Sequence, residues 1–203
     1  LRAEGGTFTP NPEVDAVGWF GMKKAWKRMT YSRDREVLEW AATLHERPSA
    51  SRVFLVRHAD AVSRKEWAED EALRPLSKLG IKQTSALQDM LTRNPVTRVY
   101  SSRSTRCAAT VEPIAEALEM EIRHLDALEE GHPPEMLADS VAELQGHSSV
   151  ICSHGDVISS FIGLTAAEGA KIDGPLRWAK GSVWVLDLIN GRVRRARYLP
   201  AAL

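Results

Sequence analysis

The chain has little of several features that would place it in common classes of protein. Of its 203 residues only two are cysteines, Cys107 and Cys152, and both lie in core-like segments. We therefore expect free thiols and a reducing, cytoplasmic compartment rather than a disulfide framework. The formal net charge is +0, which argues against nucleic acid or an acidic membrane surface as a partner. No run of about 18 apolar residues occurs, so no membrane-spanning helix is expected.

Several sequence motifs are absent as well. The chain has no Gly-x4-Gly-Lys loop for nucleotide phosphates, no Gly-x-Ser-x-Gly nucleophile turn and no His-Glu-x2-His zinc motif. The N-terminus lacks the apolar core of a signal peptide. It starts at Leu1 without a methionine, and we expect this beginning to be a cut or truncated end.

What the chain does have, from Arg52 onward, is an alternation of β-type and helical segments. This pattern predicts an α/β domain over residues 52–203, with helices on both faces of a mostly parallel sheet and a C-terminal hairpin around Asn190-Gly191. The expected strands are 53–56, 98–101, 121–124, 149–153, 183–188 and 193–198. The expected helices are 77–91, with Ser77 as the N-cap, 104–120, 133–145 and 157–162.

Residues 1–47 differ in character from the rest of the chain. They predict a strand over 13–20 and helices over 22–29 and 32–46, with too few core residues to fold well alone. The segment 48–51, Pro-Ser-Ala-Ser, is the predicted linker.

Three of the predicted strands end in residues that bind anions. Arg57 and His58 follow the first strand, Arg103 and Arg106 follow the second, and His154 follows the strand that contains Cys152. In open α/β sheets, ligands bind at the carboxyl ends of the strands. Guanidinium groups are always charged and can fork onto two oxygens, so this set of side chains predicts a site for a phosphoryl group.

These residues also resemble the motifs of a known family. Arg57-His58-Ala59, Ser101-Ser102 with Arg106, and Ser153-His154-Gly155 resemble the histidine phosphatase superfamily, although its first motif is more often Arg-His-Gly. Arg74-Pro75-Leu76-Ser77, with Gly80 and Gln83, is similar to the small SixA-like phosphatases of that family. The resemblance implies a three-layer, phosphoglycerate mutase-like fold and phosphatase activity through a phosphohistidine.

Two histidines and two arginines are the central candidates for catalysis. Imidazole is mostly neutral near pH 7, so His58 can attack phosphorus, and the resemblance implies the same nucleophile. Arg57 and Arg106 are expected to bind the phosphoryl oxygens, with Arg103 as a weaker alternative for the second position. His154 is expected to stabilise the transferring group.

The remaining candidates bind the substrate or protonate the leaving group. The resemblance assigns a general acid to Leu128-Glu129-Glu130, which favours Glu130, with Glu129 close behind. Ser63, Arg64, Ser102 and Gly155 are expected to contact substrate. Neither a metal nor another cofactor is expected for the phosphatase step.

The first 47 residues have a resemblance of their own. Gly5-Gly6-Thr7-Phe8, Glu13-Val14-Asp15, Trp19-Phe20, Thr30-Tyr31, Asp34-Arg35 and Val37-Leu38 resemble the C-terminal end of a Nudix hydrolase domain. In actinobacterial MutT-like proteins such a domain precedes a histidine phosphatase domain. The Nudix box, whose glutamates hold Mg²⁺, does not occur in this sequence, so Mg²⁺ would belong to a missing half of a parent protein.

The sequence therefore predicts a metal-independent phosphohydrolase that acts on a phosphomonoester. Its expected partners are a small phosphorylated substrate, with nucleotides suggested by the Nudix-like start, and the missing Nudix half. A second interpretation is a phosphate- or nucleotide-binding regulatory module with little turnover. Two features favour it: Ala59 replaces the usual glycine of the first motif, and the general acid is not fixed to one glutamate. A phosphoglycerate-type mutase is a weaker interpretation, since no long insertion is present to exclude water.

Overall fold

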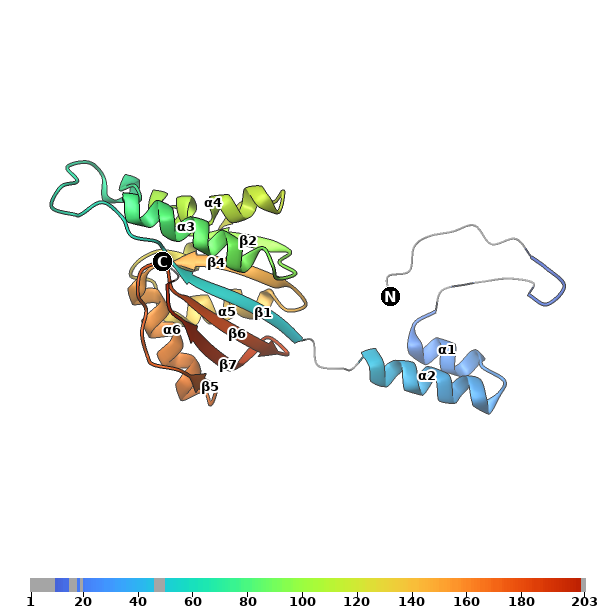
Figure 1. Cartoon of the computed structure of the whole chain (residues 1–203). Coiled ribbons are helices and arrows are strands. Elements are labelled where there is room, and N and C mark those ends of the chain that lie inside the picture. The colour runs from blue at the N-terminus through green and yellow to red at the C-terminus, as the bar shows by residue number, and fades with distance from the viewer. Residues whose placement is uncertain (1–9, 15–17, 19, 46–49, 202–203) are drawn as a thin grey trace. The chain divides into compact units, whose positions relative to one another are not determined.

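The computed structural model describes residues 10–14, 18, 20–45 and 50–201 of the chain. Two compact units make up the chain, Leu1–Arg47 and Pro48–Leu203 (Figure 1). Within the described residues, no helix is long and apolar enough to cross a membrane.

The first unit contains two helices, α1 (Met22–Arg28) and α2 (Ser32–His45), where the sequence predicts them. The strand predicted over 13–20 is wrong for its described residues, none of which is in a strand. The backbone N–H groups of Glu13 and Val14 instead donate to Oδ1 of Asn11, at 2.9 and 3.0 Å. An asparagine side chain that binds the backbone in this way favours a turn over a strand. Residues 15–17 and 19 lie outside the described residues.

The second unit is built on a 7-stranded sheet with strand order β3-β2-β4-β1-β6-β7-β5. Its strands are β1 (Ala50–Arg57), β2 (Arg98–Ser101), β3 (Ile122–His124), β4 (Ser148–Ser153), β5 (Lys171–Asp173), β6 (Val183–Ile189) and β7 (Arg192–Leu199). Strand β6 is antiparallel to both of its neighbours, and all the other pairings are parallel. The sheet is therefore mixed and mostly parallel, as predicted.

Helices cover both faces of this sheet, with α3 (Lys78–Leu91) and α4 (Thr105–Ala117) on one face and α5 (Pro134–Glu143) and α6 (Gly155–Ala167) on the other (Figure 1). Alternate residues of β1 point to opposite faces. Phe54 and Val56 join the core under α3 and α4, whereas Val53 and Leu55 join the core under α5 and α6. The predicted α/β arrangement of helices around a mixed sheet is confirmed.

The structure corrects several predicted boundaries. The predicted linker is wrong in its second half, because Ala50 and Ser51 already pair with Ile189 and Leu188 of β6 and so lengthen β1. Residues 48 and 49 lie outside the described residues. The helix predicted over 104–120 ends at 117, shortly before Glu119, whose φ is 53°. The helix predicted over 157–162 runs from 155 to 167, and the short strand β5 had no clear signal in the sequence.

Strand register brings the predicted site residues to one edge of the sheet. Arg57 at the end of β1 pairs with Ser153 of β4, and Ser101 at the end of β2 pairs with Cys152 of β4. The residues that follow these three strands therefore lie beside one another. Two short 3-10 helices lie in the loops that follow β1 and β3, namely η1 (Glu71–Leu73) and η2 (Asp126–Leu128).

Candidate active site

The two predicted histidines lie side by side at the carboxyl edge of the sheet. The centroids of the His58 and His154 rings are 5.4 Å apart, with 64° between the ring planes. The backbone N–H of His58 donates to the carbonyl of Ser153 at 3.0 Å, which joins the two strand ends directly. Both rings are buried, at 4% and 1% exposure. The expected convergence of the two imidazoles is therefore present.

One ring nitrogen of His58 is held by the backbone and the other is left for chemistry. Nδ1 lies 2.8 Å from the carbonyl oxygen of Ala59, which can only accept, so Nδ1 carries the hydrogen and Nε2 keeps its lone pair. The pKa of His58 is lowered to about 3, mainly by burial and in smaller part by the neighbouring His154, Arg106 and Arg57. His58 is therefore neutral at pH 7, as a nucleophile requires.

Ala59, which replaces the glycine of the usual motif, fits the backbone without strain. It does not belong to the non-glycine residues with positive φ among the described part of the chain. Its side chain is fully buried, and its N–H donates to Oγ1 of Thr110 at 2.9 Å. The substitution therefore leaves the position of His58 intact, because a glycine is required only where φ is positive or space is missing.

Arg57 lies flat against the backbone at the start of α6. A Cβ on Gly155 would lie 2.8 Å from Cζ of Arg57, so only glycine leaves room for this guanidinium. One nitrogen, Nη1, donates to the carbonyl of Trp178, whereas Nε is buried without a partner. Arg57 lines the cavity described below, as does Gly155. A substrate in the cavity can therefore reach both Arg57 and Gly155, which is what their predicted contact with substrate requires.

Arg106 stands in the first turn of α4 and is 1% exposed. Its Nη1 donates to the carbonyl of Glu71 at 2.9 Å. Its Nη2 lies 3.1 Å from Oε2 of Glu130 and 3.3 Å from Nδ1 of His154. Its Nε is buried without a partner, like that of Arg57. Two buried guanidinium N–H groups therefore lack acceptors at the place where a phosphoryl group is expected.

His154 caps α6 and is held by polar atoms on both sides of its ring. Nε2 lies 3.0 Å from Oγ of Ser102 and 3.5 Å from Sγ of Cys107. Nδ1 lies 3.3 Å from Oε1 of Glu130, in addition to its contact with Arg106. The Ser102 hydroxyl can accept the hydrogen on Nε2. Nδ1 can then either keep its lone pair and accept, or carry a second hydrogen and donate. Ser102 therefore orients His154 and does not line the cavity, which differs from its predicted contact with substrate.

The structure separates the two candidate acids. Glu130 contacts Arg106 and His154 and lines the cavity, whereas Oε1 of Glu129 accepts the backbone N–H of Arg103. Around them the turn is fixed, since Oδ2 of Asp156 accepts the N–H of Gly131 at 2.9 Å. Of the two carboxylates, only that of Glu130 is placed to exchange a proton with a substrate.

Arg103 does not reach the phosphoryl position that it was considered for. Its guanidinium is 63% exposed and forms an ion pair with Asp126, which raises the pKa of Arg103. Arg106, in the first turn of α4, is instead the guanidinium that lies beside His154.

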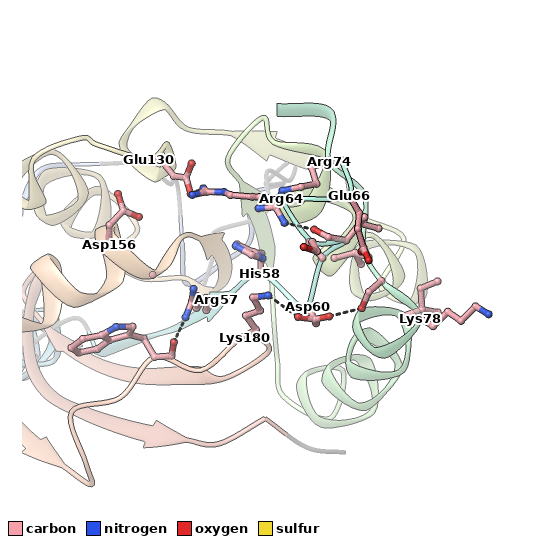
Figure 2. A pocket seen from close by; sticks show the side chains of 18 of the residues that line it. Arg57, His58, Asp60, Arg64, Glu66, Arg74, Lys78, Glu130, Asp156 and Lys180 are labelled. Atoms are coloured by element: carbon pink, nitrogen blue, oxygen red, sulfur yellow. Dashed lines mark hydrogen bonds and ion pairs between the residues drawn. The ribbon is translucent and has the colours of Figure 1, made fainter. Parts of the chain in front are cut away.

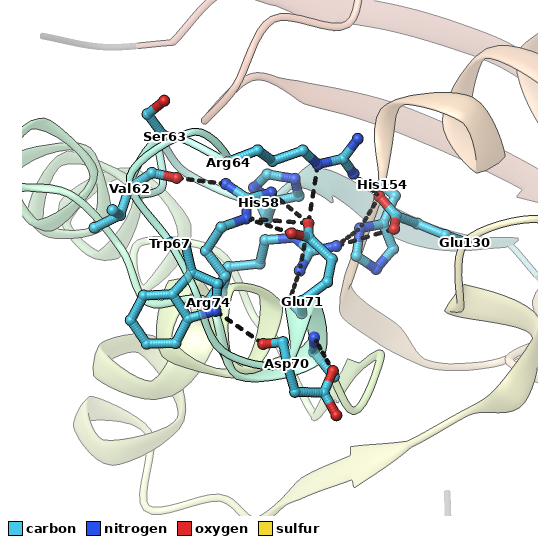
Figure 3. Close-up of polar contacts among 12 residues, drawn as sticks. His58, Val62, Ser63, Arg64, Trp67, Asp70, Glu71, Arg74, Glu130 and His154 are labelled. Atoms are coloured by element: carbon cyan, nitrogen blue, oxygen red, sulfur yellow. Dashed lines mark hydrogen bonds and ion pairs between the residues drawn. The ribbon is translucent and has the colours of Figure 1, made fainter.

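A loop from Val62 to Arg74 covers one side of the site and contains functional contacts that sequence reasoning missed (Figure 3). Glu71 accepts from Arg74 at 2.8 Å and from Arg64 at 3.1 Å. The hydrogen bond with Arg74 is the main cause that lowers the pKa of Glu71 to about 2. Ser63 and Arg64 line the cavity, and Arg64 also lies 3.6 Å from Glu130; their contact with substrate stays a prediction. The Arg74-Pro75 pattern was visible in the sequence, but Glu71 had no signal.

A second missed cluster, of Asp60, Ser77 and Lys180, also borders the site. Nζ of Lys180 lies 2.7 Å from Oδ1 of Asp60, and Oγ of Ser77 donates to Oδ2 at 2.6 Å. Burial raises the pKa of Asp60, but these two bonds outweigh it and lower the pKa. Gln83 joins the same two loops, accepting the N–H of Asp60 and donating to the carbonyl of Lys180.

Several of these side chains open into one cavity of about 1190 Å³ (Figure 2), whereas Arg106 and His154 are buried behind its wall and do not line it. Its wall includes Arg57, His58, Arg64, Glu130 and Lys180. Ligand pockets of about 300–1,000 Å³ bury most of a drug-sized molecule, so this space holds far more than a phosphoryl group. In the described part of the chain, no group of three His, Cys, Asp or Glu side chains is arranged to hold a metal ion. Metal-free chemistry stays a prediction.

Comparison with known proteins agrees with this geometry. Residues 53–137 match the model of the histidine phosphatase superfamily (branch 1). An 8-oxo-(d)GTP phosphatase of Mycolicibacterium smegmatis is 34% identical over 205 residues, which cover 98% of this chain. The chain spans 62% of the length of that curated relative. Residues 53–137 are therefore similar to the histidine phosphatase superfamily, and the expected enzyme class, a phosphatase, is the one that these matches support.

Solved structures show the same fold. A protein histidine phosphatase SixA, solved in complex with tungstate, superposes with a TM-score of 0.59 at 18% identity, covering 73% of this chain and 94% of its own. A mycobacterial glucosyl-3-phosphoglycerate phosphatase superposes with a TM-score of 0.56 at 16% identity, covering 74% of this chain and 96% of its own. At these identities the likeness concerns the fold, which is phosphoglycerate mutase-like, as expected.

Proposed function

We propose that the unit Pro48–Leu203 hydrolyses a phosphomonoester through a phosphohistidine on His58, without a metal ion. The observation that carries this proposal is the state of the His58 ring. Its Nδ1–H is donated to the Ala59 carbonyl, its pKa is lowered to about 3, and the residue lines the cavity. A neutral imidazole held in this way keeps Nε2 as a nucleophile throughout the physiological pH range.

The first step transfers the phosphoryl group to His58. Arg57 and Arg106 are proposed to bind its oxygens, because both have a buried Nε–H without an acceptor. Nε2 of His58 forms a bond to phosphorus as the bond to the leaving oxygen breaks. Glu130, in its protonated form, gives its proton to that oxygen. His154 stabilises the charge on the transferring group from its Nδ1 side, which faces Arg106 and Glu130.

The second step releases the phosphate. A water molecule attacks phosphorus, Glu130 takes the proton that the water loses, and the bond from Nε2 to phosphorus breaks. His58 returns to its neutral form and inorganic phosphate leaves. Glu130 thus acts first as acid and then as base, as one carboxyl group can in a two-step displacement.

For the substrate class and the parent protein we propose a nucleotide-related phosphomonoester and a Nudix/histidine phosphatase protein. The name of the Mycolicibacterium relative, an 8-oxo-(d)GTP phosphatase, supports a nucleotide. The Nudix-like residues of the first unit support the second part of the proposal, with the Nudix half and its Mg²⁺ as the expected partner.

The direct test is the loss of activity in a His58→Ala variant. Release of p-nitrophenol from p-nitrophenyl phosphate is expected to fall to background, while far-UV circular dichroism stays unchanged. His147→Ala, a change of the same kind in the turn before β4, is the matched control and is expected to keep full activity. Acid-labile phosphate trapped on the wild-type chain would mark the intermediate. Full turnover by His58→Ala would rule the proposed function out.

The contacts of Arg106 favour one alternative. This guanidinium is 1% exposed and is already engaged by Glu130, so the site could bind phosphate without fast turnover. The unit would then be a phosphate- or nucleotide-binding regulatory module of a Nudix hydrolase. Calorimetry that detects phosphate binding, together with no phosphate release from a panel of nucleotides and phosphomonoesters, is the result that would favour this alternative.

A further inference from the structure

Glu71 lies at the centre of three guanidinium groups. Its carboxylate is 2.8 Å from Arg74 and 3.1 Å from Arg64, and its Oε1 is 3.6 Å from Nη1 of Arg106. Its backbone carbonyl accepts from the same Nη1 at 2.9 Å. Glu71 therefore contacts the buried Arg106 with both its main chain and its side chain.

These contacts decide which part of Arg106 remains for an anion. A guanidinium group binds an oxyanion best with two parallel N–H groups on one edge. Nη1 is occupied by Glu71, so the edge formed by Nε and Nη2 is the one that can take a phosphoryl group. On that edge Nε has no acceptor, and Nη2 meets the partly exposed carboxylate of Glu130 and the His154 ring.

Glu71 is itself held by Arg74. Nε of Arg74 lies 3.0 Å from each carboxylate oxygen of Glu71, and Nη1 donates to the carbonyl of Val62 at 2.7 Å. Arg74 is 6% exposed, so this pair is shielded from water on the arginine side. The start of the loop, at Val62, and its end, at Arg74, are thereby tied together around Glu71.

Two carboxylates contact Arg106, those of Glu71 and Glu130, and the charge of Glu71 indicates that they have different roles. The hydrogen bond with Arg74 lowers the pKa of Glu71 to about 2, so Glu71 has no proton to give near neutral pH. Proton transfer is therefore assigned to Glu130, and the role that fits Glu71 is to hold Arg106 in position.

We propose that Glu71 and Arg74 form a positioning pair that presents the Nε–Nη2 edge of Arg106 to the phosphoryl group. In this scheme both residues act through Arg106, although Arg74 also lines the cavity. The proposal rests on the proposed role of Arg106 in binding phosphate, but it requires no turnover.

The test measures orthophosphate binding by calorimetry, so that failure of the enzyme reaction and failure of the positioning pair are distinguishable. Glu71→Gln keeps the shape of the side chain and the backbone carbonyl but removes the charge that holds Arg74. Because losing one hydrogen bond between charged groups weakens binding about 10- to 100-fold, we expect phosphate affinity to fall by about that factor when Arg106 is no longer held in place. The matched control is Asp187→Asn, which breaks a surface ion pair in which Oδ1 of Asp187 lies 2.7 Å from Nη2 of Arg52. This variant should leave phosphate affinity unchanged.

A double-mutant cycle then asks whether the two residues act as one unit. Arg74→Met should weaken phosphate binding as much as Glu71→Gln does, and the double variant should be no weaker than either single variant. Arg74→Lys, which keeps the charge but loses the fork, should lie between wild type and Arg74→Met. This last variant also serves if Glu71→Gln does not fold.

Three results would overturn the proposal. Glu71→Gln could lower the melting temperature with phosphate affinity unchanged, which would make the pair merely structural. The effects of the two single variants could multiply in the double variant, which would make them independent. A wild-type chain that binds no orthophosphate would remove the role of Arg106 on which the pair depends.

Discussion

Replacing Glu130 with glutamine should separate the binding of phosphate from its turnover. The carboxylate lies 3.1 Å from Nη2 of Arg106 and 3.3 Å from Nδ1 of His154, at the place that a phosphoryl oxygen would otherwise take. In the resting site Glu130 is therefore both the proposed acid and a competitor of the substrate. Glu130→Gln removes the acid and weakens the competitor in one change.

The two effects have different sizes. General acid catalysis contributes about 10²–10⁴-fold, so kcat for an alkyl phosphate should fall by about that factor. For p-nitrophenyl phosphate, whose leaving group needs little protonation, the fall should be much smaller. The Glu130 side chain is 42% exposed but Arg106 is 1% exposed, so their ion pair is only partly screened and is worth at least the about 0.2–1 kcal/mol of exposed pairs. Losing it should therefore tighten orthophosphate binding by about fivefold or more.

Steady-state kinetics with the two substrates, and calorimetry with orthophosphate, would measure these effects. Glu129→Gln is the matched control, because Glu129 accepts the backbone N–H of Arg103 and lies away from the two imidazoles. Equal losses of kcat for both leaving groups, combined with weaker phosphate binding, would refute the reasoning. Such a result would mean that Glu130 holds the site together instead of transferring protons.

Three further predictions concern the neighbours of the site. Gly155→Ala should lower kcat/KM at least about tenfold with little loss of fold, because the new Cβ would lie 2.8 Å from Cζ of Arg57 and displace it. Gly80→Ala should instead lower the unfolding free energy, by roughly 1–3 kcal/mol in urea denaturation, since its Cβ would lie 1.9 Å from the carbonyl oxygen of Asp60. His58 should make the unfolding free energy fall as pH decreases from about 6.5 toward 3, because its folded-state pKa of about 3 lies below the unfolded value, so protons bind preferentially to the unfolded chain. A urea titration series in which His58→Gln shows the same slope as wild type over that pH range would contradict this assignment.

Short apolar runs bounded by polar residues were enough to predict most of the sheet. The run Val53–Val56 is buried on both faces, as parallel strands are, and its burial is visible in composition alone. The hairpin was equally clear, because Asn190 and Gly191 both adopt positive φ, of 52° and 74°, which only a few residues tolerate. The short strand β5 was missed because three residues without an apolar run carry too little pattern.

The errors at element ends have a common physical origin. Ala50 and Ser51 have weak strand propensity, yet β6 offers them backbone partners and so extends β1. Helix α4 continues through Pro113, where packing of Val111 and Ile114 in the core offsets the N–H that proline lacks. Tertiary contacts decide such boundaries, and local sequence does not contain them.

The amino-acid sequence by itself determined the α/β class and the convergence of His58, Arg57, Arg106 and His154, since parallel strands place their carboxyl ends at one edge whatever the loops do. The tertiary structure decided which groups complete the site. Glu71 reaches Arg106 across 35 positions and Lys180 reaches Asp60 across 120, through loops without periodic pattern. The choice of Glu130 over Glu129 likewise depended on the direction of one turn. Charge and hydrogen-bonding capacity can be read along a chain, but the distances that turn them into chemistry arise only when the loops pack.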